Sequence, residues 1–194
     1  MRLHATTPGK HITSYTKGER KMAIMRLSAT CCRCFAAPVQ LWASQPSSSP
    51  LVAFYSMDPI VLLSWNVRGL NTRAQRDVVR VLLQDTRASV VCLQETKLSL
   101  VDVDVIQCMC GSQFKDFAYL PAADTRGGAF VACHQDVASF SDVSVRCFSV
   151  TIKISPCSGE PSWWLTTVYG PQEDDDKVLF LEELEATRAA CAGP

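Results

Sequence analysis

Two short apolar runs on either side of an amphipathic stretch constrain the fold of this chain more than any other feature of its sequence. Ile60–Trp65 and Ser89–Gln94 are continuous apolar runs, which is typical of strands buried on both faces. Asn71 and Thr72 are candidate N-caps for a helix from about Arg73 to Asp85. The apolar face of this helix would consist of Ala74, Val78, Val81 and Leu82. A strand, a helix and a strand in this order predict a right-handed βαβ unit with parallel strands.

The residues that follow predict further strands joined by short turns. Apolar patterns favour strands at Phe114–Leu120, Ala129–Cys133 and Ser162–Tyr169. Before the last of these, the alternating apolar positions change phase near Cys147, which predicts a bulge or a bend. A final helix is expected at about 177–190, with an inward stripe of Val178, Leu181, Leu184 and Arg188. The fold class is therefore α/β, with one βαβ unit followed by a mostly hairpin-linked sheet.

The distribution of charge divides the chain into two segments. The formal net charge is zero, but residues 1–56 carry seven basic side chains and one acidic side chain. Their net charge is +6, and residues 57–194 carry −6. Residues 1–56 show no helical or strand periodicity, so we expect a disordered leader ahead of an acidic body. The composition of this leader also suits an organelle transit peptide, a basic arm that contacts nucleic acid phosphates, or sequence upstream of a translation start at Met57.

The ten cysteines predict neither a disulfide framework nor a zinc site. Cys31, Cys32 and Cys34 lie too close together for one zinc site, and no second Cys or His pair follows at the required spacing. The sequence shows no secretory apolar region, so we expect reduced thiols in an intracellular protein. It also lacks the run of about 18 apolar residues that a membrane-spanning helix needs.

Polar side chains stand where the first two predicted strands end. Asn66 follows the first apolar run and Glu95 follows the second. Because parallel neighbours end at the same edge of a sheet, we expect these two side chains to lie within a few ångströms of each other. Carboxylate and carboxamide oxygens are suitable ligands for Mg²⁺. The alternative is that both residues are polar only because strand ends meet solvent.

Four motifs in order resemble the first half of the endonuclease/exonuclease/phosphatase family. They are SWNVRGLN, LQETK, RGGAF and TTVYGP, and the resemblance runs from Met57 to the end of the chain. In particular, the motifs are similar to those of the endonuclease domain that opens the reverse transcriptases of plant LINE-type (non-LTR) retrotransposons. This divides the chain into a basic leader at 1–56 and a partial family domain at 57–194. The resemblance implies a Mg²⁺-dependent DNA endonuclease, with Mn²⁺ as an alternative ion, and a nuclear location.

The resemblance also implies roles for individual residues. Asn66 would help to position the metal and the catalytic acid, Glu95 would be the main Mg²⁺ ligand, and Tyr169 would contact the scissile phosphate. Many relatives carry Asn where this chain has Thr167, whose hydroxyl can still donate to a phosphate. Further candidates for DNA phosphate contacts are Arg68, Lys97 and Arg126, for which a solvated surface position is the alternative.

Two later motifs of the family, an Asp-x-Asn motif and a Ser-Asp-His motif, do not occur in these 194 residues. His134, the one histidine of the body, does not match the catalytic histidine and is expected at a surface or a strand end. The family fold is a four-layer α/β sandwich of the deoxyribonuclease-I-like type, and we expect it to be truncated here before the second sheet. The uncovered sheet face would favour self-association, and the chain alone should show little or no nuclease activity.

Two other functions remain open from the sequence. One is a non-catalytic, transposon-derived remnant or nucleic-acid-binding module, which would use the basic leader to hold phosphates. The other is a small-molecule phosphodiesterase or phosphatase, since the family includes such enzymes.

Overall fold

The computed structural model describes residues 2–7, 10–17, 20–27, 33–36, 39–43, 59–123, 127–171 and 173–191, and they form two sheets and three helices. The first sheet has the strand order β1 (Arg2–Thr7), β2 (Lys10–Lys17), β3 (Arg20–Leu27), β6 (Ile60–Asn66), β7 (Val90–Gln94), β9 (Ala129–Cys133) and β8 (Asp116–Leu120). The second has the order β10 (Ala138–Val145), β11 (Ser149–Pro156), β12 (Trp163–Val168), β5 (Val39–Ala43) and β4 (Arg33–Ala36). The helices are α1 (Arg73–Thr86), α2 (Val103–Met109) and α3 (Asp176–Cys191).

The βαβ unit forms as the sequence predicts. Strands β6 and β7 pair in parallel, and α1 connects them, whereas the other pairings of the first sheet are antiparallel. Thr72 is the N-cap of α1 and forms a capping box with Gln75. The apolar face of α1 differs from the prediction, because Val79 and Leu83 are buried while Val78 and Val81 are more than half exposed.

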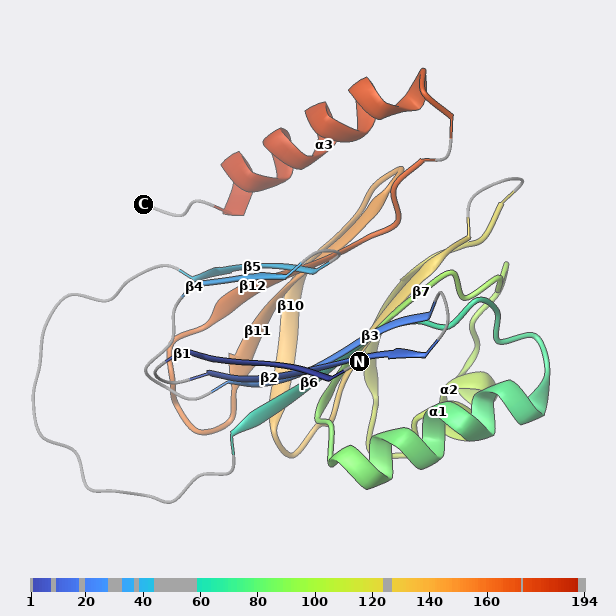
Figure 1. The fold of residues 1–194 in the computed structure, drawn as a ribbon, viewed down its shortest axis with the longest axis vertical. Helices are drawn as coiled ribbons and strands as arrows, with labels where there is room; N and C mark the ends of the chain where they lie inside the picture. Colours follow the sequence, from blue (N-terminus) through green and yellow to red (C-terminus); the bar gives the residue numbers. More distant parts are fainter. Residues whose placement is uncertain are drawn as a thin grey trace, which may run out of the picture.

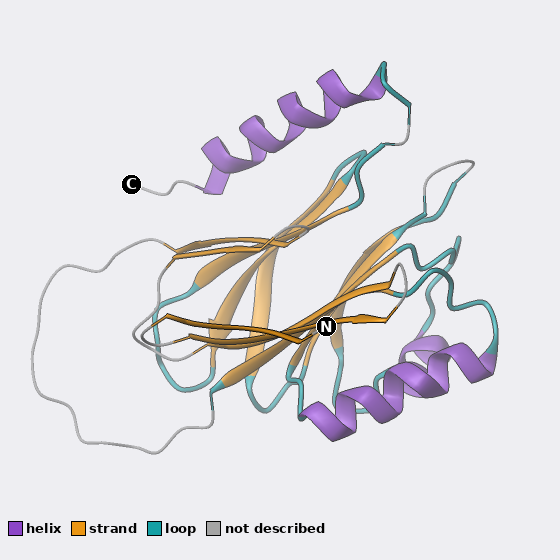
Figure 2. Ribbon diagram, viewed as in Figure 1, coloured by secondary structure: helices purple, strands orange, loops and turns teal. Residues whose placement is uncertain are grey.

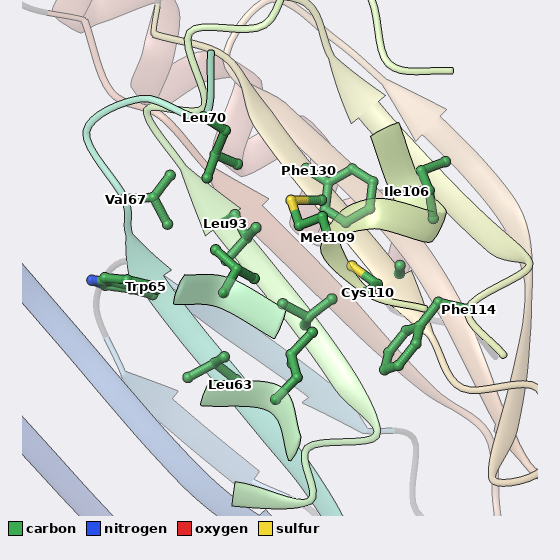
Figure 3. Close-up of a cluster of buried hydrophobic side chains, with 14 of the residues drawn as sticks. Leu63, Trp65, Val67, Leu70, Leu93, Ile106, Met109, Cys110, Phe114 and Phe130 are labelled. Atoms are coloured by element: carbon green, nitrogen blue, oxygen red, sulfur yellow. The ribbon is translucent and has the colours of Figure 1, made fainter. Parts of the chain in front are cut away.

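The central strands β6, β7 and β9 of the first sheet are covered on both faces, and the expected truncation before the second sheet is wrong. Helices α1 and α2 cover one face, where their apolar side chains pack around Leu63, Leu93 and Phe130 (Figure 3). The second sheet lies against the opposite face (Figures 1 and 2), in a core that includes Ile152 and Leu165. Strands β10, β11 and β12 therefore build a second layer, whereas β8 and β9 extend the first sheet. The predicted self-association through an uncovered sheet face stays a prediction.

Strands in the first 43 residues differ from the expectation of a disordered leader. β3 pairs with β6 in antiparallel register from Met22 opposite Trp65 to Leu27 opposite Ile60. Met25 is buried in the core between the sheets, and Ile24 packs on the helix side. The alternation of apolar residues in β3 is short and interrupted by basic residues, so the sequence shows no clear strand pattern there. The domain boundary at residue 57 stays a prediction.

Helix α3 lies on the outer side of the second sheet, and a carboxylate of this helix accepts hydrogen bonds from that sheet (Figure 1). Glu183 accepts hydrogen bonds from the backbone N–H of Cys147 at 2.9 Å and of Phe148 at 3.1 Å, and from Ser149 Oγ at 2.5 Å. Phe180 packs edge-on against Phe148. The predicted inward stripe is wrong for three of its four residues, because Val178, Leu181 and Arg188 are exposed and Leu184 is half-buried. No helix among the described residues is long and apolar enough to cross a membrane.

The cysteines within residues 92–191 are all free thiols that differ widely in exposure. Burial raises the pKa of the Cys92 thiol well above its usual value and that of Cys133 to about 12, whereas Cys147 and Cys157 are exposed. Since the thiolate is the reactive form, we expect a maleimide at pH 8 to label the two exposed cysteines in minutes and the two buried ones only on unfolding. Peptide mapping by mass spectrometry would read this out. Early labelling of Cys92 would contradict the core described above.

Candidate functional site

The end of the parallel strand pair brings Asn66 and Glu95 together. Asn66 is the last residue of β6 and stands opposite Gln94, the last residue of β7. Asn66 Nδ2 donates a hydrogen bond to Glu95 Oε1 at 2.7 Å, and both residues are half-buried. The proximity predicted from parallel pairing is thus confirmed. One oxygen of the Glu95 carboxylate and Asn66 Oδ1 are left for other partners.

The backbone around this pair is held in an unusual conformation. Arg68, Glu95 and Lys97 have φ values of 55°, 54° and 58°, in the left-handed region that residues other than glycine rarely adopt. Backbone hydrogen bonds fix the segment, from Leu70 N to Thr96 O at 2.8 Å and from Lys97 N to the Gly127 carbonyl at 2.8 Å. Such conformations cost about 1 kcal/mol or more each and tend to occur at functional sites, where surrounding contacts hold them.

Tyr169 approaches the same edge from the second sheet, and Gly127 makes room for it. A Cβ atom built on Gly127 would lie 2.8 Å from Tyr169 Cζ and 3.1 Å from Glu95 Cα. The absence of a side chain at Gly127 therefore allows the tyrosine ring to lie beside Glu95. The backbone N–H of Tyr169 donates to the Phe148 carbonyl at 2.8 Å, which holds this residue to the second sheet. Three predicted residues, Asn66, Glu95 and Tyr169, thus gather at one edge.

The residues predicted to contact phosphate lie in different environments. Arg68 and Lys97 are exposed in the loops that follow β6 and β7, beside the site. Arg126 lies outside the described residues. Thr167 is completely buried, and its Oγ1 accepts a hydrogen bond from Gln94 Nε2 at 3.2 Å. A phosphate at the surface would not reach this hydroxyl, so the structure does not support the predicted contact.

The arrangement fits a magnesium ion that keeps several of its waters. Asn66 Oδ1 is buried without a hydrogen-bond partner in the described structure, and the Glu95 carboxylate is beside it. One or two protein oxygens are a common ligand set for Mg²⁺, because this ion dehydrates reluctantly. The described ranges contain no cluster of three or more His, Cys, Asp or Glu side chains, which a zinc or calcium site would use.

His134 lies at the other end of the sheet, as expected for a strand-end residue outside the site. It follows β9, its backbone N–H donates to the Ser89 carbonyl at 2.8 Å, and its ring packs edge-on against Phe114. Sequence reasoning missed two residues that the structure places at the site, Gln94 and Gly127. Both lie within the motifs LQETK and RGGAF, so the motifs contained the signal.

Comparison with known protein families gives a match over most of the chain. The model of the Endonuclease/Exonuclease/phosphatase family matches residues 63–188, which include Asn66, Glu95 and Tyr169. No curated protein matches the chain.

Proposed function

The chain belongs to the endonuclease/exonuclease/phosphatase family, and from this we propose that it is a Mg²⁺-dependent phosphodiester hydrolase that acts on DNA. The observation that carries the proposal is the Asn66–Glu95 hydrogen bond at 2.7 Å, which leaves oxygen atoms of both side chains for a metal ion. The order and spacing of the four motifs support an origin in a LINE-type retrotransposon.

The site residues suggest a division of tasks. Asn66 and Glu95 would hold the ion, and the hydrogen bond between them keeps the carboxylate in one orientation. When bound, Mg²⁺ would offset the charge that develops on a phosphate during hydrolysis. Tyr169 would orient the phosphate from the second sheet, while Arg68 and Lys97 add positive charge at the rim.

The chain by itself should hydrolyse DNA slowly. The Asp-x-Asn and Ser-Asp-His motifs, which in the family implied by the resemblance supply a general base and a donor near the leaving oxygen, do not occur in these residues. Loss of such groups costs orders of magnitude in rate. We therefore expect slow nicking, which nonetheless depends on the Glu95 carboxylate.

A plasmid-nicking assay tests this function. With Mg²⁺, we expect the wild-type chain to convert supercoiled DNA to the open circle slowly, and Glu95→Ala to be slower by about tenfold or more. Glu185→Ala is the matched control, because Glu185 is exposed on α3 and is not one of the residues that form the site. Chelation of Mg²⁺ should abolish the difference. Equal rates for Glu95→Ala and the wild type would refute hydrolysis at this site.

A binding function without hydrolysis is favoured by the net charge of +6 on residues 1–56. If this segment holds DNA phosphates, replacing Lys10, Lys17 and Lys21 by Gln should weaken binding and make it less steeply dependent on salt, by roughly one unit of slope for each lost contact. A variant with Lys115, Lys153 and Lys177 replaced by Gln is the control with the same change in net charge. Equal affinity and equal salt dependence in both variants would remove this alternative.

A further inference from the structure

We propose that Gln94 is a positioning residue, whose carboxamide holds the edge of the first sheet that carries Asn66 and Glu95 in register with Tyr169 on the second sheet. This inference rests on the proposed function for its meaning in catalysis, but the alignment of the two sheets can be measured without any activity.

Gln94 lies at the centre of a small polar cluster directly beneath the site. Its side chain is 2 % exposed, and its Nε2 lies 3.2 Å from Thr167 Oγ1 and 3.5 Å from Ser64 Oγ. Each member stands just before a site residue in its own strand. Ser64 comes two residues before Asn66, Gln94 comes directly before Glu95, and Thr167 comes two residues before Tyr169. The cluster therefore connects the ends of β6, β7 and β12, the three strands that lead into the site.

The hydrogen bond between Gln94 and Thr167 supplies what the apolar contacts between the sheets cannot. The core between the sheets is built from aliphatic side chains such as Leu62, Ile152 and Leu165. Their attraction has no preferred direction, so it holds the sheets together without fixing their offset. The Gln94–Thr167 contact is a side-chain hydrogen bond that connects β7 of the first sheet to β12 of the second. It can fix that offset because hydrogen bonds weaken steeply with distance and angle.

The cost of this arrangement argues against a merely structural role. Gln94 Oε1 is buried and has no hydrogen-bond partner in the described structure. Apolar side chains in place of both Gln94 and Thr167 would fill the same core without an unsatisfied oxygen, so stability alone favours an apolar pair here. Alignment of Glu95 with Tyr169 is a function that an apolar pair could not provide.

Two neighbouring threonines allow a matched test. Thr166 and Thr167 are both buried. The hydroxyl of Thr166 shares a hydrogen bond with Thr151 Oγ1 within the second sheet, at 3.0 Å, whereas the hydroxyl of Thr167 accepts a hydrogen bond from Gln94 across the sheets. Thr166→Val and Thr167→Val remove one buried hydroxyl each from adjacent positions. Thr167→Ser keeps the hydroxyl and should restore wild-type behaviour.

The first measurement is the position of Tyr169 relative to the first sheet. In the full-length protein, we expect an NMR cross-peak between the Tyr169 ring and the Gly127 Hα, because a Cβ on Gly127 would meet that ring. The cross-peak should weaken at least about twofold in Thr167→Val and persist in Thr166→Val and Thr167→Ser. An unchanged cross-peak in Thr167→Val would overturn the proposal, whether or not the protein cleaves DNA.

The second measurement separates this proposal from the proposed function. Thr167→Val should lower the Mg²⁺-dependent nicking rate at saturating DNA about tenfold with little change in the DNA concentration that gives half the maximal rate, while Thr166→Val stays within about twofold of the wild type. If the wild type shows no Glu95-dependent nicking, the proposed function fails and the cross-peak alone decides the role of Gln94. If nicking depends on Glu95 but is equal in both valine variants, the function stands and the positioning role falls.

Discussion

Replacing Leu165 by alanine is expected to lower the free energy of unfolding by about 3 kcal/mol. Leu165 of β12 is fully buried in the core between the two sheets, so its truncation removes apolar contacts and leaves a cavity. The effect would show that the second sheet is packed on the first, which is the main feature of the fold that the sequence did not predict. Urea denaturation followed by circular dichroism would measure it.

Leu181→Ala is the matched control, since the same atoms are removed from a side chain of α3 that is 59 % exposed. We expect this variant to stay within about 0.5 kcal/mol of the wild type. Similar losses for the two leucines would mean that Leu165 is not buried between sheets. An unchanged urea midpoint for Leu165→Ala would contradict the two-sheet core directly.

Gly127→Ala is expected to displace the Tyr169 ring and to cost about 1–3 kcal/mol in the free energy of unfolding. The new methyl group would lie 2.8 Å from Tyr169 Cζ, closer than two carbon atoms can approach, and 3.1 Å from Glu95 Cα. Either the ring or the segment that carries Glu95 must move. Nicking should therefore fall together with the stability, and the ring resonances of Tyr169 should shift.

Gly170→Ala provides the comparison for this substitution. Neither Gly127 nor Gly170 has a positive φ, but a Cβ on Gly170 would meet only ordinary contacts with the Phe180 ring at 3.7 Å. We expect a change within about 0.5 kcal/mol and normal nicking. Tyr169 resonances that stay in place in Gly127→Ala would show that the ring does not lie beside this glycine.

The parts of the fold that depend on local pattern could be predicted from the sequence. Two apolar runs with a capped helix between them predicted the parallel pairing of β6 and β7, and this pairing brought Asn66 and Glu95 together as expected. The family match at residues 63–188 agrees with the resemblance carried by the four motifs, whereas the retrotransposon origin remains a proposal.

The missed features depend on contacts between distant segments. A hairpin such as β10–β11 can extend a sheet or begin another, and its apolar alternation is the same in both cases. Thr167 was predicted as a phosphate contact because it stands where many relatives carry Asn and its hydroxyl can still donate, but its partner, Gln94, is 73 residues away in the sequence. No local pattern shows which face of β12 that hydroxyl occupies relative to another sheet.

The pairing of β3 with β6 has a consequence for where a shorter chain could begin. The strand that carries Asn66 has β7 on one side and residues 20–27 on the other. A chain that started at Met57 would leave one side of β6 with a row of unpaired N–H and C=O groups. Such a bare edge is a template for strands from other molecules. Solubility, rather than catalysis, would then be the first property that removal of the basic segment changes.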